Sequence, residues 1–309
     1  MYYITLSMVS KRKIDVKGKK YWILIHSVRK GNKIVQKKKY IGKILPPKKR
    51  LEQLKKDFLK ELSGKRYKFL SKDDVEKIEK KKVNYKNEIK RLSKTEKQSK
   101  LKEFAIRYTY DSSKISGLNV TLRQTFLILK EGIIPKDFKN LRVAKALENH
   151  EKGFLLLTKY KGKLDIKFIK RLHKILFSGV DDEIAGNLRS ELKRDIKIAG
   201  TPYVPPKWQG LDKEINNFFR WYKAENRKMH PLELASLIHL KLISIQPFVD
   251  GNSRLSRLLM NWILWKKGYP PINLPVEDLE NYYNALDKCQ IEKQEKPFLN
   301  YIMKRYIEY

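Results

Sequence analysis

The sequence contains little cysteine and little histidine. Its 309 residues include one cysteine, Cys289, and five histidines. A single thiol excludes an internal disulfide and any metal site built from several cysteines. The histidines lie far apart, without the spacing of metal ligands: His26, His150, His173, His230 and His239. We therefore expect neither a disulfide framework nor a zinc site.

Long apolar runs are also missing. No apolar stretch reaches the roughly 18 residues that a membrane span needs, so we expect no membrane partner. Residues 1–9 are apolar and precede the basic residues 11–13, which reverses the order of a secretory signal. Together these features predict a cytoplasmic protein.

Acidic residues are few relative to basic ones. The chain has 34 Asp and Glu against 70 Lys and Arg, which gives a formal net charge of +36. Such a balance favours an acidic partner such as nucleic acid. A general enrichment of lysine in the proteome of the source organism is the alternative explanation.

Residues 1–48 are expected to form a small basic β-rich module. Residues 21–29 and 33–41 are rich in β-branched and aromatic side chains, and Gly31-Asn32 between them is a hairpin signal. Residues 1–9 are a candidate third strand.

The positive charge is concentrated in residues 11–50. This region holds sixteen Lys or Arg residues and one acid, Asp15. The interleaved Tyr21, Trp22 and Tyr40 are side chains that can stack on bases or sugars. These features predict contact with nucleic acid or another polyanion, without base-specific readout. The alternative is a sheet that uses these aromatic residues as its core and exposes a solvated basic face.

Residues 49–100 have the pattern of a charged helical connector that follows Pro46-Pro47. One helical face carries apolar residues at helical spacing: Leu51, Leu54, Phe58 and Leu62. A second helix is indicated by Ser71-Lys72-Asp73-Asp74, which resembles a capping sequence. Lysine-rich residues 77–82 are explained by a solvated face.

The stretch from Gln246 to Arg257 lies between two apolar segments, residues 232–245 and 258–265, each long enough for a buried helix. Its central residues 250–253 predict a tight turn that opens onto a helix. The free N–H groups and the positive end of such a helix attract anions.

Charged side chains strengthen this prediction. Arg254 and Arg257 carry guanidinium groups suited to forked contact with phosphate oxygens. Asp250 offers the hard oxygen ligand that a phosphate-bound magnesium ion uses. The stretch is therefore expected to bind a nucleotide polyphosphate.

This stretch resembles the signature of the Fic (Fido) family, His-Pro-Phe-x-(Asp/Glu)-Gly-Asn-Gly-Arg-x-x-Arg. The matching residues are Pro247, Phe248, Asp250, Gly251, Asn252, Arg254 and Arg257, while Gln246 stands at the His position and Ser253 at the second Gly. The resemblance implies that the loop binds ATP and Mg²⁺ and transfers AMP to a hydroxyl of a target protein. It places Gly251, Asn252, Ser253, Arg254 and Arg257 at the nucleotide and Asp250 at the metal.

Gln246 decides how much activity is expected. In the family, the His takes the proton of the attacking hydroxyl, whereas a Gln amide accepts a hydrogen bond but no proton near neutral pH. General-base catalysis is typically worth ~10²–10⁴-fold. Transfer should therefore be weakened or altered while phosphate binding survives. Ser253 adds a Cβ near the phosphates together with a hydroxyl donor.

Residues 108–118 resemble the inhibitory helix of the family, (Ser/Thr)-x-x-x-Glu-(Gly/Asn). Ser112 and Gly117 match, but Ser116 occupies the position of the Glu that pairs with the second Arg of the loop. A neutral hydroxyl cannot replace that carboxylate beside Arg257. Autoinhibition by the usual mechanism is expected to be absent. Selection for binding without transfer explains this pattern, as do engineered substitutions or drift.

Two further segments resemble family features. Gly186, Arg189 and Ile198, with Pro205-Pro206, match a flap hairpin that docks an extended target segment by strand addition; an ordinary surface hairpin is the alternative. Tyr283 lies where the family lines its adenine pocket, although a core aromatic residue fits equally. His150, His173 and His239 are expected to be structural.

The expected fold is mainly α, with a Fic core in residues 101–309 that carries a short β-hairpin flap. The module at residues 1–48 and the connector at residues 49–100 precede it. One hypothesis is a nucleotide-binding Fic protein with weakened AMP transfer. The other is a catalytically inactive regulatory protein that couples nucleotide binding to polyanion binding by residues 11–50.

Overall fold

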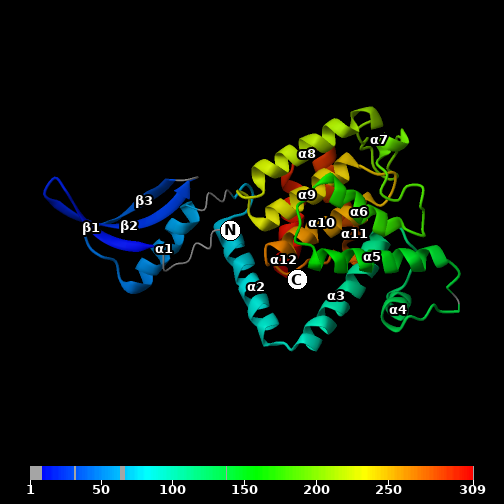
Figure 1. Cartoon of the computed structure of the whole chain (residues 1–309), viewed down its shortest axis with the longest axis horizontal. Coiled ribbons are helices and arrows are strands. Elements are labelled where there is room, and N and C mark those ends of the chain that lie inside the picture. The colour runs from blue at the N-terminus through cyan, green and yellow to red at the C-terminus, as the bar shows by residue number, and fades with distance from the viewer. Residues whose placement is uncertain (1–8, 31–32, 63–66, 137, 309) are drawn as a thin grey trace. The chain divides into compact units, whose positions relative to one another are not determined.

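A computed structural model describes residues 9–30, 33–62, 67–136 and 138–308 (Figure 1). The elements follow the order β1 (Ser10–Val16), β2 (Lys19–Lys30), β3 (Lys33–Gly42), α1 (Lys48–Leu62), α2 (Lys72–Arg91), α3 (Lys94–Ile115), α4 (Leu122–Phe126), the π-helical turn η2 (Leu127–Glu131), α5 (Leu141–Lys159), α6 (Ile166–Phe177), α7 (Arg189–Leu192), the 3₁₀ turn η3 (Trp208–Gly210), α8 (Leu211–Glu225), α9 (Pro231–Ile245), α10 (Asn252–Lys266), the 3₁₀ turn η4 (Val276–Asp278), α11 (Leu279–Glu292) and α12 (Lys296–Glu308). The chain divides into two compact units, Met1–Arg66 and Tyr67–Tyr309. Within the described ranges, no helix has both the length and the hydropathy that a membrane crossing requires. The prediction of a mainly α fold with an N-terminal β module is confirmed.

The first unit is a three-stranded antiparallel sheet in the order β1-β2-β3, with α1 packed on one face. The amphipathic α1 places Leu51, Phe58 and Leu59 against Leu24 of the central strand. The predicted pairing of β2 with β3 is confirmed, although the Gly31-Asn32 turn lies outside the described residues.

The third strand differs from the expected one. It is β1, Ser10–Val16, while residues 1–8 lie outside the described chain. Lys17 and Gly18 both have positive φ and join β1 to β2 as a two-residue turn. Asp15 secures this turn because its Oδ1 accepts a hydrogen bond from the Gly18 N–H at 2.9 Å.

The unit boundary also differs from the expected division at residues 48 and 100. Helix α1 completes the core of the sheet, whereas α2 packs on α12 in the second unit. Val75 and Ile78 are buried there, and Lys81 Nζ donates to the Tyr306 carbonyl at 2.7 Å. The segment interpreted as one connector therefore contributes to two separate cores.

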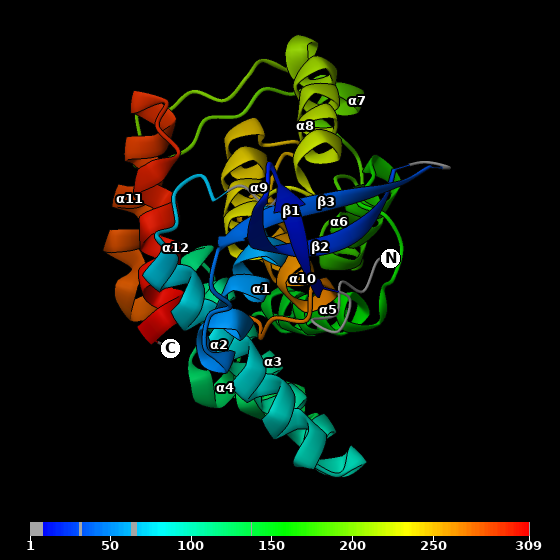
Figure 2. The ribbon, with the colours of Figure 1, turned by 90° about the vertical axis from the view of Figure 1, so that its left-hand side faces the viewer.

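Helices α9 and α10 lie at the centre of the second unit, in contact with α3, α5, α6, α8 and α12 (Figures 1 and 2). Pro231 starts α9, which is apolar and buried on nearly every side. Most of α10 is equally buried, including the large Trp262. The short connection between these helices is consequently held at both ends by the core.

Candidate anion-binding site

The loop between α9 and α10 is fixed by its own backbone. Gln246 ends α9 in the left-handed conformation, with φ of 51°, and its N–H donates to the Leu242 carbonyl. The side chain of Asn252 closes the loop, because its Oδ1 accepts from the Phe248 N–H at 2.9 Å and its Nδ2 donates to the Phe248 carbonyl at 2.8 Å. The Asn252 side chain thus shapes the loop, and its contact with a phosphate stays a prediction.

Gly251 makes a turn that no other residue fits. Its φ is 76°, and a Cβ built on it would lie 2.3 Å from Cε2 of Phe177 on α6. The loop therefore depends on glycine for its conformation and for its close approach to α6.

The first turn of α10 leaves backbone donors open. The N–H groups of Asn252, Ser253 and Arg254 have no acceptor within the described chain, and Gly251 supplies no capping side chain. The first helical bond runs from the Leu255 N–H to the Gly251 carbonyl. These open donors and the positive end of the helix dipole have the arrangement that the predicted anion site requires.

Arg254 is buried beside these donors with few partners of its own. It is 4% exposed, its Nε has no hydrogen-bond partner, and its guanidinium lies 4.9 Å from the ring centroid of Phe177. Burial lowers the pKa of the guanidinium. Its ion pair is with Asp250, at 3.4 Å. A buried cation with one distant counterion attracts an anion.

Asp250 presents its carboxylate to solvent. The side chain is 68% exposed. Among the described residues, no group of three His, Cys, Asp or Glu side chains is placed to hold a metal ion. One exposed carboxylate fits a Mg²⁺ ion that takes its remaining ligands from phosphate and water.

Arg257 is buried among neutral oxygens. Its guanidinium donates to the Ser112 carbonyl at 2.6 Å, to Ser116 Oγ at 2.7 Å and to Ser253 Oγ at 2.5 Å. The described chain places no carboxylate within ion-pair distance of it. Ser116 therefore occupies the position expected for the inhibitory residue, and its uncharged hydroxyl accepts a hydrogen bond from Arg257. Whether autoinhibition is absent stays a prediction.

Arg189 stabilises the loop through hydrogen bonds to its carbonyl groups. It is fully buried, its Nε donates to the Gln246 carbonyl at 2.6 Å, and its backbone N–H donates to the Pro247 carbonyl at 2.9 Å. A second guanidinium nitrogen reaches the Pro206 carbonyl. The prediction that Arg189 docks a target is wrong, because its donors are used by loop carbonyls inside the protein.

The expected flap consists of two extended arms over residues 193–207, with a turn at Ala199-Gly200 (Figure 2). No strand or backbone pairing joins the arms within this described segment, so the predicted β-hairpin is corrected. Side chains hold the second arm instead. Thr201 Oγ1 donates to Asp287 on α11 at 2.7 Å, and the Tyr203 hydroxyl donates to the Ser244 carbonyl at 2.9 Å.

Ile198 lies on the first arm and is half-buried. The backbone groups of residues 196–198 make no hydrogen bond within the described chain. That is the state an edge needs in order to accept an added strand.

His173 connects the segment before α7, at Gly186, to the loop between α9 and α10, a role that the sequence did not reveal. Its Nδ1 accepts from the Gly186 N–H at 3.0 Å, so its Nε2 carries the proton and donates to the Asp250 carbonyl at 3.0 Å. The ring stacks on Phe248 at 3.7 Å. Burial lowers the pKa of His173 to about 4, which keeps the imidazole neutral. Gly186 is thus packed against α6, with φ of 79°, instead of lying on a docking surface.

Gln246 makes no side-chain hydrogen bond within the described chain, although it is buried. His239, two helical turns earlier, does not replace the missing base. Its Nε2 lies 3.1 Å from the Tyr282 hydroxyl, and burial holds its pKa well below the usual value. This confirms the structural role expected for His239.

Tyr283 is exposed rather than part of the core. The residue is 44% exposed, and its hydroxyl donates to the Ile115 carbonyl at the end of α3 at 2.8 Å. The neighbouring Tyr282 is the buried aromatic residue. The ring of Tyr283 is therefore available to a planar ligand.

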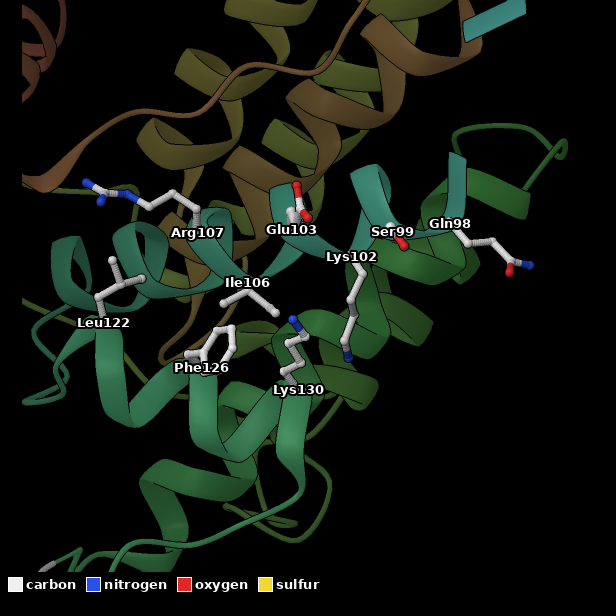
Figure 3. Close-up of a pocket in the computed structure, with 9 residues that line it drawn as sticks. All are labelled: Gln98, Ser99, Lys102, Glu103, Ile106, Arg107, Leu122, Phe126 and Lys130. Carbon is white, nitrogen blue, oxygen red and sulfur yellow. The ribbon is translucent and has the colours of Figure 1, made fainter. Parts of the chain in front are cut away.

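A separate hollow of about 450 Å³ lies between α3 and the α4–η2 segment (Figure 3). Ile106, Leu122 and Phe126 form its apolar floor. Lys102 pairs with Glu151 and Arg107 with Asp111 and Glu277, and the third cation, Lys130, lies 5.0 Å from the ring centroid of Phe126. None of the loop residues lines this hollow, so it is not part of the anion site.

The fold and the loop define a helical domain with open backbone N–H groups and buried guanidinium groups at a helix N-terminus. Residues 163–264 match the Fic/DOC family. It is 34% identical over 211 residues to the protein adenylyltransferase Fic of Drosophila ananassae and of Drosophila melanogaster. The match covers 65% of this chain and 40% of each relative, so the chain spans well under half their length.

Solved structures agree with this assignment. A Fic domain containing signaling protein from Bacteroides thetaiotaomicron is 25% identical, with a TM-score of 0.66, over 76% of this chain and 94% of that one. Fic-1 from C. elegans is 22% identical, with a TM-score of 0.64, over 85% of this chain and 75% of that one. The second likeness concerns the fold alone.

Proposed function

We propose that this protein binds ATP with Mg²⁺ at the α9–α10 loop and transfers AMP slowly to a hydroxyl of a target protein. The relatives named protein adenylyltransferase support this class of reaction. The observation that carries the proposal is the burial of Arg254 and Arg257 beside three open N–H groups, without a buried carboxylate between them.

The electrostatic energy of the two buried guanidinium groups favours a ligand with several negative charges. A buried guanidinium loses its hydration, and neutral hydroxyls compensate this loss only in part. A triphosphate restores the charge balance, with Arg254 at the open donors. Arg257 can exchange its bond to Ser116 for a phosphate oxygen, because a neutral contact is weaker than an ion pair. Asp250 would hold Mg²⁺ there, and the ion would neutralise part of the phosphate charge.

The absence of a general base at Gln246 should make the transfer of AMP slow. The hydroxyl oxygen of the target attacks the α-phosphorus, the bond to the β-phosphate oxygen breaks, and pyrophosphate leaves. Gln246 can orient the hydroxyl by accepting its hydrogen bond, but the proton must pass to solvent. An acceptor that is already deprotonated does not need the base.

The target is proposed to lie along the first flap arm. Residues 196–198 offer unpaired backbone groups, so an extended segment can add to them as a strand. Tyr283 is proposed to contact the adenine ring from α11. The proposal includes a cytoplasmic location, where ATP and protein targets occur together.

Incubation of the protein with α-labelled ATP and cell extract tests transfer. Labelled protein is expected to appear slowly and to disappear with Arg254→Ala. Arg220→Ala removes an exposed guanidinium from α8 and serves as the matched control. The absence of label at every concentration of the protein contradicts transfer.

A second candidate function is regulatory. In this reading the nucleotide-bound domain controls contact of residues 11–50 with nucleic acid or another polyanion. Its support is the exposure of the described lysine and arginine side chains on β1 and α1, including Lys11, Lys13, Lys48 and Arg50. ATP binding without label, together with polyanion binding, favours this function over transfer.

A further inference from the structure

The amide of Gln246 is an unused hydrogen-bonding group beside the proposed nucleotide site. The residue is 8% exposed, and its side chain has no hydrogen-bond partner within the described chain. Its amide atoms are not sealed from solvent, unlike the unpartnered Nε of Arg254. The accessible part of Gln246 therefore includes the amide, which can donate two hydrogen bonds through Nε2 and accept through Oε1.

No histidine of the surrounding core can serve as the base for an acceptor bound at this amide. His150, His173 and His239 are all fully buried. Both ring nitrogens of His173 are hydrogen-bonded, and Nε2 of His239 lies 3.1 Å from the Tyr282 hydroxyl. A hydroxyl at Gln246 must therefore lose its proton to solvent, whereas an anionic acceptor has no proton to lose.

An ionised carboxylate fits a site that has amide donors and no base. Carboxyl groups ordinarily have pKa values of about 4 and are ionised at neutral pH, whereas only about one tyrosine hydroxyl in a thousand is ionised there. Carboxylate oxygens only accept hydrogen bonds, so Nε2 of Gln246 is a suitable donor to them. Aspartate and glutamate also act as nucleophiles toward phosphorus. A phosphorylated acceptor is less suitable, because it brings a second negative charge beside the triphosphate.

The first flap arm carries positive charge next to the same site. One guanidinium connects the arm to the loop, because Arg189 donates to the Gln246 carbonyl at 2.6 Å and to the Arg194 carbonyl at 3.3 Å. Lys193 and Lys197 on this arm are exposed, and neither has an ion-pair partner within the described chain. The arm therefore begins beside Gln246 and presents two unpaired cations.

The acid of the arm does not cancel these cations. Asp195 accepts a hydrogen bond from the Trp208 N–H at 2.8 Å and lies 3.6 Å from Nη1 of Arg189. A strand added along residues 196–198 would place its side chains about 5 Å from those of the arm, where opposite charges attract each other. An acidic segment therefore complements Lys197 in charge.

We propose that the preferred acceptor is a carboxylate of an acidic, extended target segment, held by Nε2 of Gln246 and docked along Lys193 and Lys197. The carboxylate oxygen forms a bond to the α-phosphorus, the bond from that phosphorus to the β-phosphate oxygen breaks, and pyrophosphate leaves. The product is a mixed anhydride of the carboxylate and AMP, and no proton has to be removed. The inference rests on the proposed binding of ATP and transfer of AMP, and it names the acceptor that needs no base.

Purified full-length protein with α-labelled ATP, Mg²⁺ and a synthetic peptide tests the proposal. A ten-residue peptide in which valine alternates with glutamate and serine offers both acceptors on one strand. We expect at least about tenfold more label on glutamate than on serine, because only the serine needs a base. Neutral hydroxylamine should release this label and leave a hydroxamate on the peptide, since it cleaves a mixed anhydride and leaves a phosphodiester to serine intact.

Variants of the protein test the two parts of the proposal separately. Gln246→His should move the label to serine and make it resistant to hydroxylamine, because it supplies a base. Lys197→Glu should raise the KM for the peptide several-fold, because it places like charges opposite each other. Lys152→Glu alters an exposed lysine of α5 with the same change in net charge, and it should leave the KM unchanged. Thermal unfolding of each variant verifies that the fold is intact.

The outcomes distinguish this inference from the proposed function on which it rests. Label that resists hydroxylamine in the unaltered protein overturns the carboxylate acceptor and leaves AMP transfer standing. Equal effects of Lys197→Glu and Lys152→Glu overturn the arm as the docking surface of an acidic segment. If the peptide stays unlabelled while proteins of a cell extract become labelled, the response of that label to hydroxylamine decides in the same way. The absence of label from both peptide and extract overturns transfer and the inference together.

Discussion

The two basic regions of this protein hold their charge in opposite ways. On the sheet of the first unit, lysine and arginine side chains such as Arg12 and Lys38 are exposed. At the start of α10, Arg254 and Arg257 are buried inside a helical core. We propose that both regions attract anions, and we expect them to differ in specificity and in their response to salt.

The difference arises from hydration. Exposed cations keep their water and are screened by salt, so their contacts are weak and tolerant of the partner. Buried guanidinium groups have lost that water and are fixed by Phe177, Asp250 and the serines of α3 and α10. A preorganised site of this kind selects an anion by shape as well as by charge. The comparison predicts that loop variants and sheet variants affect different ligands.

The largest effect is expected when the missing base is returned to the buried site. Gln246→His should raise AMP transfer by ~10²–10⁴-fold, because the loop retains its phosphate-binding groups and lacks the proton acceptor. The rate of label incorporation from α-labelled ATP measures it, with Gln246→Asn as a control that restores no base. An unchanged rate shows that the loop is not competent for transfer.

A smaller effect on stability is expected at Gly251. Gly251→Ala places a residue with a side chain at a positive φ and its Cβ 2.3 Å from Phe177. Overpacking and strain in the left-handed backbone should together lower the free energy of unfolding by about 2–5 kcal/mol. Urea unfolding measures the loss, and nucleotide binding should fail while polyanion binding by the sheet persists.

Gly200→Ala is the matched control for that loss. Gly200 also has positive φ, but nothing lies within 4 Å of its Cβ position. Equal losses for the two variants would contradict the close approach of the loop to α6.

The stability of the loop region should depend on pH through His173. Its pKa is about 4 in the folded protein and about 6.5 when unfolded, so between these values the unfolded chain binds a proton that the folded chain does not. The free energy of unfolding should therefore fall as pH drops from 6.5 to 4, by about 3 kcal/mol for this residue. Stability is complete above pH 6.5.

His173→Gln retains hydrogen-bonding capacity and removes the titration. Urea unfolding at pH 7.5 and pH 4.5 is expected to show a smaller pH difference for this variant than for the unaltered protein. His150 and His239 also have pKa values lowered by burial and titrate in the same direction in both proteins. Identical pH differences would show that His173 is not held neutral.

Salt should affect the two regions unequally, which is the smallest of the predicted effects. A contact of two or three phosphates with the sheet should weaken about 7- to 20-fold between 50 mM and 200 mM salt. ATP binding at the buried loop should change by less, because buried pairs are screened less. Parallel titrations with single-stranded nucleic acid and with Mg-ATP measure this, and equal slopes contradict the comparison.

Local features of the fold and the site could be predicted from the sequence. The turn at residues 250–253, the helix after it and the β2–β3 pairing depend on neighbouring residues, and the structure agrees with them. Ser116 beside Arg257 followed from the family resemblance, and the structure places them 2.7 Å apart.

Features that depend on distant contacts could not be predicted. His173 hydrogen-bonds to both Gly186 and Asp250, and Asp250 follows it by 77 residues in the sequence. No local pattern indicates this pair of hydrogen bonds. The sequence around Arg189 is typical of a surface cation. In the structure Arg189 is buried and donates hydrogen bonds to loop carbonyls. The unit boundary was missed for the same reason, since an amphipathic helix does not reveal which core it joins.

Calorimetric titration with ATP and Mg²⁺ tests the buried site most directly. We expect saturable one-to-one binding, weakened at least tenfold by Arg254→Ala and unchanged by Arg220→Ala. If the unaltered protein shows neither heat nor a thermal shift with any magnesium nucleotide, the buried guanidinium groups do not form a nucleotide site and the central claim fails.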